Sequence, residues 1–189
     1  MSWWTTERKR YAGQYLIHGA ALTAIGSAGL VSRWANVEAS GGPASVNPYS
    51  GAFGIAQWLG SRLPPIKGNT NFDAQLAYAV RELNGSETRA GNVLRNARTV
   101  TEAARGASMY ERAEGYNAAT GTDNWTAKTA SGIPSIAALL SATAVPENVA
   151  QNQSNGSYQD SAIEVPGNTN TKLLTGIAAG AALLWLLRS

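Results

Sequence analysis

The feature that most constrains this chain is the segment at residues 31–58, VSRWANVEASGGPASVNPYSGAFGIAQW, which joins a helical pattern to a stop signal and a turn-rich loop. Val31, Trp34 and Glu38 follow one another at spacings of three and four residues, which places them on one face of a helix. The Gly-Gly-Pro sequence at residues 41–43 then ends this helix. The pattern therefore predicts an amphipathic helix that carries one carboxyl group, Glu38, close to its end.

The predicted surroundings of Glu38 favour a carboxyl group that holds its proton. Trp34 lies one turn before Glu38 on the same face, and an indole beside a carboxyl group removes water from it, which raises the pKa. The last turn of a helix also disfavours a negative charge because of the helix macrodipole. Both effects predict a Glu38 that can act as a general acid near neutral pH. The alternative is a glutamate that faces water at a helix end.

A series of motifs follows in the same order as in a known family. They are Glu38-Ala39-Ser40-Gly41 with Asn47-Pro48, Ser50-Gly51-Ala52 and Gly54-Ile55-Ala56-Gln57-Trp58; Leu59-Gly60-Ser61-Arg62-Leu63; Phe72-Asp73-Ala74-Gln75-Leu76-Ala77-Tyr78 with Glu82-Leu83; and Val100-Thr101-Glu102-Ala103-Ala104 with Tyr110-Glu111-Arg112. Together they resemble the phage tail lysozyme family of the lysozyme-like superfamily, with the soluble lytic transglycosylases as more distant relatives. The resemblance implies a mainly helical, lysozyme-like fold and peptidoglycan glycan strands as the substrate.

The resemblance also implies roles for individual residues. Glu38 is the expected catalytic residue, and Ser40 is expected to orient it. Gln57 is expected to bind the substrate through a hydrogen bond or to position Glu38. Tyr116 and Asn117 resemble a Tyr-Asn element that lines the cleft of lytic transglycosylases, so they are candidate substrate-binding residues.

The reaction type depends on whether a second carboxylate is present. Glycoside hydrolysis usually needs two carboxylates, but the next acidic residues after Glu38 are Asp73 and Glu82, which lie outside the loop that follows it. The lytic transglycosylases, as a resembling family, need only one, so we predict a lytic transglycosylase that cleaves the β-1,4 bond between N-acetylmuramic acid and N-acetylglucosamine. The alternatives are a muramidase of the same fold, which hydrolyses that bond, and a catalytically silent structural or channel protein of the virion.

The composition excludes several other classes of function. The chain of 189 residues has no cysteine and a single histidine, so we expect no thiolate site and no metal site. No phosphate-binding or dinucleotide-binding fingerprint is present, and we expect no cofactor. The net charge is only +3 and the basic residues are scattered apart from Arg8-Lys9-Arg10, so we expect no nucleic-acid partner.

The chain divides into three predicted parts. Residues 1–144 form the all-α catalytic domain, residues 145–171 have the polar composition of a linker, and residues 172–189 form a hydrophobic helix. Within the domain we expect two helices that break near Gly26, then helices at 72–83, 86–96 and 99–115, and a last helix from Pro134 to 144.

The C-terminal segment indicates where the enzyme works. Residues 173–187 are apolar apart from one threonine, which predicts a short membrane anchor; the alternative is a helix that docks on a partner protein. A polar linker and such an anchor suit an enzyme stored in a phage virion, in an internal membrane or in the core or tail, with other virion proteins as partners. It would act at the bacterial cell envelope, in the periplasm, so that the genome can enter. The rival is a bacterial wall-remodelling enzyme with the same anchor.

Overall fold

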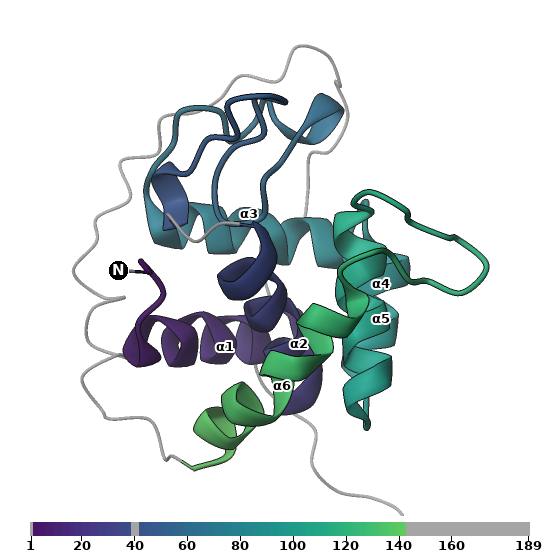
Figure 1. The fold of residues 1–189 in the computed structure, drawn as a ribbon. Helices are drawn as coiled ribbons and strands as arrows, with labels where there is room; N and C mark the ends of the chain where they lie inside the picture. Colours follow the sequence, from purple (N-terminus) through teal and green to yellow (C-terminus); the bar gives the residue numbers. More distant parts are fainter. Residues whose placement is uncertain (1, 39–41, 143–189) are drawn as a thin grey trace, which may run out of the picture. The chain divides into compact units, whose positions relative to one another are not determined.

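Helices make up most of the part of the chain that the computed structural model describes, which is residues 2–38 and 42–142. The α-helices are α1 (Thr6–Ala20), α2 (Ala24–Arg33), α3 (Phe72–Asn84), α4 (Thr88–Asn96), α5 (Val100–Glu111) and α6 (Thr126–Ser141) (Figure 1). A π-helical turn, η1 (Trp34–Glu38), extends α2, and η2 (Gly42–Ala44) and η3 (Gly60–Arg62) are 3-10 turns. These residues contain isolated β-bridges but no β-strand, which confirms the predicted all-α fold.

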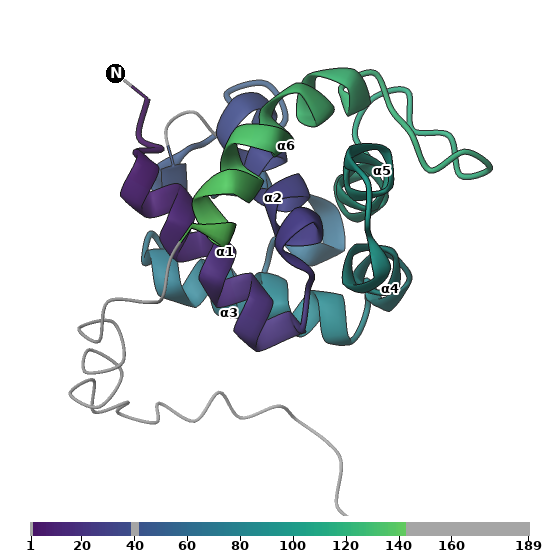
Figure 2. The same ribbon diagram turned by 90° about the horizontal axis from the view of Figure 1, so that it is seen from below.

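Helix α2 is the centre of the domain. All of its residues from 26 to 33 are buried, and α1, α4, α5 and α6 pack around it (Figure 1, Figure 2). Glycines allow this close packing: a Cβ atom at Gly29 would lie 2.7 Å from the carbonyl oxygen of Ala103, which is too close for any side chain. Because α2 continues directly into η1, Glu38 lies at the end of the buried central helix of the domain.

The predicted helix starts at Asn71 and Thr99 are confirmed. The Asn71 side chain accepts a hydrogen bond from the backbone N–H of Ala74 and caps α3. Thr99 and Glu102 form the predicted capping box, in which each side chain accepts from the other residue's backbone N–H. These caps form between residues close in sequence, which is why the sequence pattern identifies them.

Other predicted helix boundaries were wrong. The first two helices break at residues 21–23, where Ala21 has a left-handed backbone and Thr23 caps α2, rather than near Gly26. The last helix begins at Thr126, with Pro134 inside it rather than at its first position. A buried face carries this helix across the proline despite the missing backbone donor; it consists of Thr129, Ile133, Ile136 and Leu140. Helix α5 ends at Glu111, before the expected residue 115, because Arg112 adopts a left-handed backbone.

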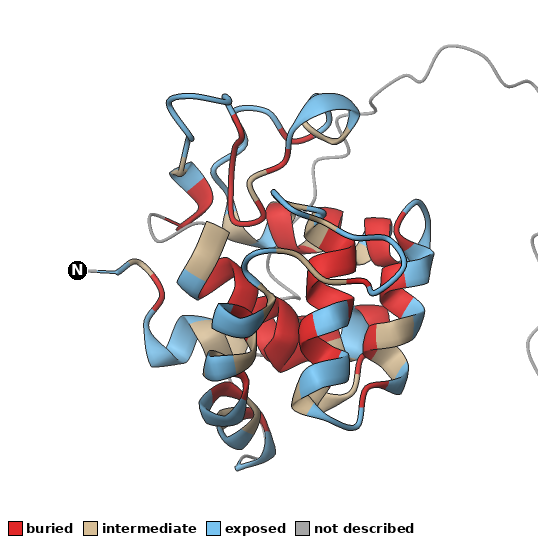
Figure 3. Cartoon of the chain, turned by 45° about the vertical axis from the view of Figure 1, so that its right-hand side comes forward, coloured by how far each residue is buried: buried red, intermediate tan, exposed pale blue. Residues whose placement is uncertain are grey.

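Residues 42–66 form an irregular layer over the helices. Bridges between Val46 and Phe53 and between Phe53 and Trp58 fold this segment back on itself. Ile55 and Trp58 are fully buried, so the segment is anchored by its apolar side chains. Figure 3 shows that exposed residues gather on the outer loops, whereas buried residues gather on the helices in the middle.

No helix within residues 2–38 and 42–142 is long and apolar enough to cross a membrane. The predicted linker at 145–171 and the predicted anchor at 173–187 lie outside the described residues. Both therefore stay predictions, and so does the domain boundary at residue 144.

Candidate active site

A buried arginine holds Glu38 in place. Arg33 ends α2, and its Nε donates to Glu38 Oε1 over 2.5 Å. The two residues are five positions apart in sequence. A π-helical turn such as η1 pairs residues at this spacing through its backbone hydrogen bonds, so Arg33 and Glu38 lie on one side of the helix. The Arg33 side chain is fully buried, so the hydrogen bonds that it makes inside the protein replace those to water.

The other edge of the Arg33 guanidinium binds Asp123. Arg33 Nη1 and Nη2 donate to the two carboxylate oxygens of Asp123, each over 2.9 Å, in a bidentate pair. Asp123 Oδ1 also accepts from the backbone N–H of Trp125 over 2.9 Å and from Ser108 Oγ over 3.3 Å. Burial opposes ionisation of Asp123, but the Arg33 hydrogen bonds outweigh it, so the pKa of Asp123 lies below its ordinary value.

Sharing one arginine between two carboxyl groups leaves Glu38 able to hold a proton. Burial is the largest effect on Glu38 and raises its pKa; the charge of Arg33 acts in the opposite direction, and the negative charge of Asp123 raises the pKa further. The net result is a raised pKa for Glu38. Its side chain is still 14% exposed, so a substrate can reach it. A buried but accessible carboxyl group of this kind is what a general acid requires.

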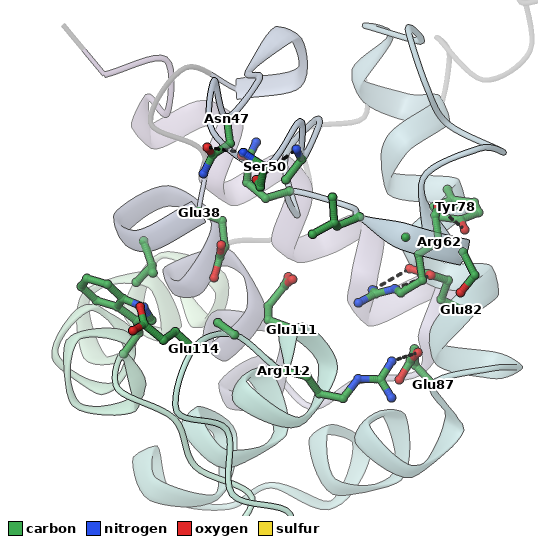
Figure 4. A pocket seen from close by; sticks show the side chains of 18 of the residues that line it. Glu38, Asn47, Ser50, Arg62, Tyr78, Glu82, Glu87, Glu111, Arg112 and Glu114 are labelled. Carbon is green, nitrogen blue, oxygen red and sulfur yellow. Dashed lines mark hydrogen bonds and ion pairs between the residues drawn. The ribbon is translucent and has the colours of Figure 1, made fainter.

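Glu38 lies in the wall of a cavity of about 960 Å³. The wall consists of Val37, Glu38, Asn47, Ser50, Ala52, Gln57, Leu59, Gly60, Ser61, Arg62, Tyr78, Glu82, Ser86, Glu87, Glu111, Arg112, Ala113, Glu114 and Trp125. Figure 4 shows the side chains of Glu38 and Glu111 near each other in its middle, and the two groups interact electrostatically. A volume at the upper end of the usual range for ligand pockets suits an extended molecule better than a single sugar.

Glu111, at the end of α5, is a second carboxyl group beside Glu38 that sequence reasoning missed. One oxygen of Glu111 accepts the indole N–H of Trp34 over 2.7 Å. Burial raises the pKa of Glu111 well above its ordinary value, and the charge of Glu38 adds to this effect. Glu111 lies far downstream of the loop that follows Glu38, in the Tyr-Glu-Arg motif, and helical spacing does not connect it with Glu38. That motif was the available signal.

A second arginine–carboxylate cluster forms another wall of the cavity. Glu82 accepts two hydrogen bonds from Arg62, over 2.7 and 2.9 Å, one from Trp58 Nε1 over 2.8 Å, and one from the Tyr110 hydroxyl over 2.6 Å. Burial raises the pKa of Glu82, but the hydrogen bonds and the charge of Arg62 outweigh it, and the net pKa is lowered. The cluster attaches the irregular layer to α3 and α5 and so fixes the shape of the cavity.

The structure brings one of the predicted substrate-binding residues to the cavity of Glu38. Gln57 lines that cavity, and its Nε2 donates to the carbonyl oxygens of Gly54, over 2.9 Å, and Ser45, over 3.3 Å. The amide N–H₂ of Gln57 therefore supports the loop. Ser40 lies outside the described residues.

Tyr116 and Asn117 lie in the loop between α5 and α6 and are not among the residues of the cavity wall. The Asn117 side chain accepts from the backbone N–H of Ala119, and its backbone pairs with Thr122, so it shapes its own turn. In this part of the chain Glu114 and Trp125 line the cavity instead. Within residues 2–38 and 42–142, no group of three or more side chains could hold a metal ion.

Comparison with known proteins identifies the family. The sequence profile of the phage tail lysozymes matches residues 7–132, which include α1 except its first residue, α2 to α5, the irregular layer and the residues of the cavity wall. Searches of curated proteins and of solved structures gave no match. The matched region covers more than half of the chain and contains Glu38 and its partners. The chain therefore belongs to the phage tail lysozyme family, and it is a phage protein of the peptidoglycan-degrading class.

Proposed function

We propose that this protein is a lytic transglycosylase of the virion that cleaves the β-1,4 bond between N-acetylmuramic acid and N-acetylglucosamine, with Glu38 as its acid and base. The observation that carries this proposal is the state of Glu38: it lines a large cavity, a buried arginine holds it, and burial raises its pKa. The family match supports the substrate class.

The proposed reaction uses one proton twice. The Glu38 carboxyl group gives its proton to the glycosidic oxygen, and the bond between that oxygen and C1 of N-acetylmuramic acid breaks. The Glu38 carboxylate then accepts the proton of the 6-hydroxyl of the same sugar, whose oxygen bonds to C1. The products are a free 4-hydroxyl on N-acetylglucosamine and a 1,6-anhydro ring, with no water consumed. Glu38 ends the cycle protonated, as it began.

Arg33 suits both halves of this cycle. While Glu38 is neutral, the positive charge of Arg33 is balanced by Asp123 through the bidentate pair. When Glu38 becomes a carboxylate, the Arg33 Nε hydrogen bond stabilises it at the moment when it must act as a base. Arg33 is thus a positioning residue that acts through Glu38.

The burial of Glu111 favours this single-residue chemistry over hydrolysis. A muramidase needs a second carboxylate, ionised, to activate water or to stabilise the sugar cation. Glu111 is in the cavity, which is the observation in favour of a muramidase. Burial raises the pKa of Glu111 well above its ordinary value, however, which disfavours the ionised form that this role requires. Mass spectrometry of digested muropeptides tests the choice: 1,6-anhydro products support the transglycosylase, and products heavier by one water indicate a muramidase.

Zymography of the full-length protein on peptidoglycan tests the activity itself. We expect wild type to clear the substrate and Glu38→Gln to leave it intact with an unchanged circular dichroism spectrum. Glu7→Gln is a matched control, because Glu7 is an exposed carboxylate in the first turn of α1. A wild-type protein that does not cleave peptidoglycan under any tested condition would indicate a silent virion structural or channel protein.

We further expect the enzyme to be part of the phage particle, in an internal membrane or in the core or tail, and to open the wall in the periplasm so that the genome can enter. The family match supports the phage origin, and the apolar sequence at 173–187 supports an anchor. Mass spectrometry of purified particles tests the first point. Flotation of the full-length protein with liposomes tests the second, and a protein that stays at the bottom of the gradient would rule out the anchor.

A further inference from the structure

Trp125 is an aromatic side chain exposed in the wall of the cavity. Within residues 2–38 and 42–142, four large hydrophobic side chains are exposed, and they are Val46, Tyr49, Leu59 and Trp125. Of these, Leu59 and Trp125 line the cavity, and Trp125 is 39% exposed. A partly exposed indole in the cavity wall leaves apolar surface in contact with water, which is a common property of ligand-contacting aromatic residues.

The backbone of Trp125 is held firmly. Its N–H donates to Asp123 Oδ1 over 2.9 Å, and its carbonyl oxygen accepts from Thr129 N–H over 2.9 Å at the start of α6. Lys128 Nζ lies 5.6 Å from the centre of the ring, a cation–π contact that restrains the side chain. Trp125 is therefore preorganised, so a ligand that contacts its ring loses little additional conformational entropy.

The position of Trp125 relative to Glu38 follows from a backbone contact. Asn124 N–H donates to the carbonyl oxygen of Glu114 over 3.2 Å, so Trp125 lies at the Glu114 end of the cavity. Figure 4 shows Glu114 on one side of Glu38 and Tyr78 on the other. The cavity thus extends to both sides of the acid, as it must if the bond to be cleaved lies within a longer strand.

We propose that Trp125 is the stacking platform of a sugar-binding subsite, at which the apolar face of one pyranose ring of the glycan strand packs on the indole. The C–H groups on that face carry partial positive charge and are attracted to the negative face of the aromatic ring. The sugar hydroxyl and acetamido N–H groups stay at the rim, where the Glu114 carboxylate is a suitable acceptor. This inference rests on the proposed function, because it assumes a glycan strand as the ligand.

The same support holds the platform and the acid. Asp123 accepts the Trp125 N–H and also binds Arg33, which in turn binds Glu38. A sugar ring stacked on Trp125 is thereby placed at a fixed distance from Glu38. Such fixed placement lowers the entropy cost of bringing the glycosidic oxygen to the acid.

Binding of a soluble oligosaccharide to an inactive protein tests the subsite. The full-length Glu38→Gln protein is titrated with the tetramer of N-acetylglucosamine by calorimetry, and the same protein carrying Trp125→Ala or Trp125→Phe is titrated alongside it. We expect Trp125→Ala to weaken binding about tenfold and Trp125→Phe to restore part of it. Tyr49→Ala is the matched control, since Tyr49 is 98% exposed and outside the cavity wall.

Two results would overturn the subsite: binding of the tetramer that Trp125→Ala leaves unchanged, or no binding of the tetramer to Glu38→Gln at millimolar concentration. If Trp125→Ala does not fold by circular dichroism, the indole N–H resonance of Trp125 in the Glu38→Gln protein decides, since stacking must shift it. Failure of the proposed function is a separate result. It would show as peptidoglycan cleavage by Glu38→Gln, which leaves the binding experiment interpretable.

Discussion

Two arginine–carboxylate clusters face the same cavity, and they treat their glutamates in opposite ways. Glu82 accepts four hydrogen bonds, from Arg62, Trp58 and Tyr110, and its pKa is lowered. Among the residues that the structure describes, the Glu38 side chain accepts one hydrogen bond, from Arg33, which also binds Asp123, and the pKa of Glu38 is raised. Both carboxyl groups are largely removed from water, so burial alone does not distinguish them.

The difference shows that the supply of donors decides which role a buried glutamate can have. A carboxylate that accepts several hydrogen bonds is stabilised as an anion and becomes part of the structure. A buried carboxyl group whose charged donor is already balanced by another acid, as Arg33 is by Asp123, more readily keeps a proton that it can give away. We therefore assign structure to the Glu82 cluster and chemistry to the Glu38 cluster.

The largest expected effect is on catalysis at Glu38. Glu38→Gln keeps the shape of the side chain but has no proton to transfer, so the rate of peptidoglycan cleavage should fall by about 10²–10⁴-fold. Its free energy of unfolding should remain close to that of the wild type, because the amide oxygen can still accept from Arg33. Turbidity assays on cell walls, together with urea denaturation, measure both quantities. Near wild-type cleavage would remove Glu38 from the mechanism.

The same substitution at the other cluster should have the opposite result. Glu82→Gln replaces a carboxylate that accepts from Arg62, Trp58 and Tyr110, and leaves the Arg62 guanidinium without its counter-charge. Breaking a buried ion pair of this kind costs about 3–5 kcal/mol of stability. Urea denaturation measures the loss. A Glu82→Gln protein as stable as Glu38→Gln would show that the two clusters do not differ in the way described.

The pH dependence of activity should respond to Asp123. Because the negative charge of Asp123 raises the pKa of Glu38, Asp123→Asn should lower that pKa. A general acid is active only while protonated, so the alkaline limb of the pH–rate profile should move to lower pH. The variant should also lose about 1–3 kcal/mol of stability, since Arg33 keeps a weaker partner. Ser108→Ala removes a hydrogen bond to Asp123 but no charge, and it should leave the limb in place. A limb that moves to higher pH contradicts the assignment.

The sequence predicted what is local. Helical spacing identified Glu38 as an acid near a helix end, and the caps at Asn71 and Thr99 depend on residues three positions away. The π-helical turn was not predicted, because the spacing of apolar residues does not distinguish it from an ordinary helix end. That turn gives Arg33 its contact with Glu38.

The rest of the site depends on packing between distant segments. Arg33 and Asp123 are 90 residues apart, and Trp34 and Glu111 are 77 residues apart. No periodicity connects such pairs, so the sequence did not predict that Glu111 and Asp123 join Glu38. The expectation for Tyr116 and Asn117 came from a resemblance in sequence, whereas the backbone of the loop places Trp125 on the cavity wall.

The smallest expected effect is the change in stability caused by Glu111→Gln. This substitution should stabilise the protein, whereas Glu82→Gln should destabilise it. Burial raises the folded-state pKa of Glu111, so this side chain contributes its full stability below its unfolded pKa of about 4.3 and loses it as the pH rises. Glu111→Gln has no proton to lose, so it should be more stable than the wild type at pH 7, by about 0.5–2 kcal/mol, provided that its amide oxygen still accepts from Trp34.

At pH 4 the advantage of Glu111→Gln should be smaller, because wild-type Glu111 then carries its proton for most of the time in both the folded and the unfolded protein. Glu82 has a lowered folded-state pKa, so its contribution is present above about pH 4.3 and is lost as the pH falls through the folded value. The destabilisation by Glu82→Gln should therefore shrink in acid, while the stabilisation by Glu111→Gln shrinks there as well. Urea denaturation at pH 4 and pH 7 measures both trends. If Glu111→Gln, compared with wild type, is less stable at pH 7 than at pH 4, Glu111 is ionised in the folded protein. Glu111 could then act as a second catalytic carboxylate, and hydrolysis would become the better supported reaction.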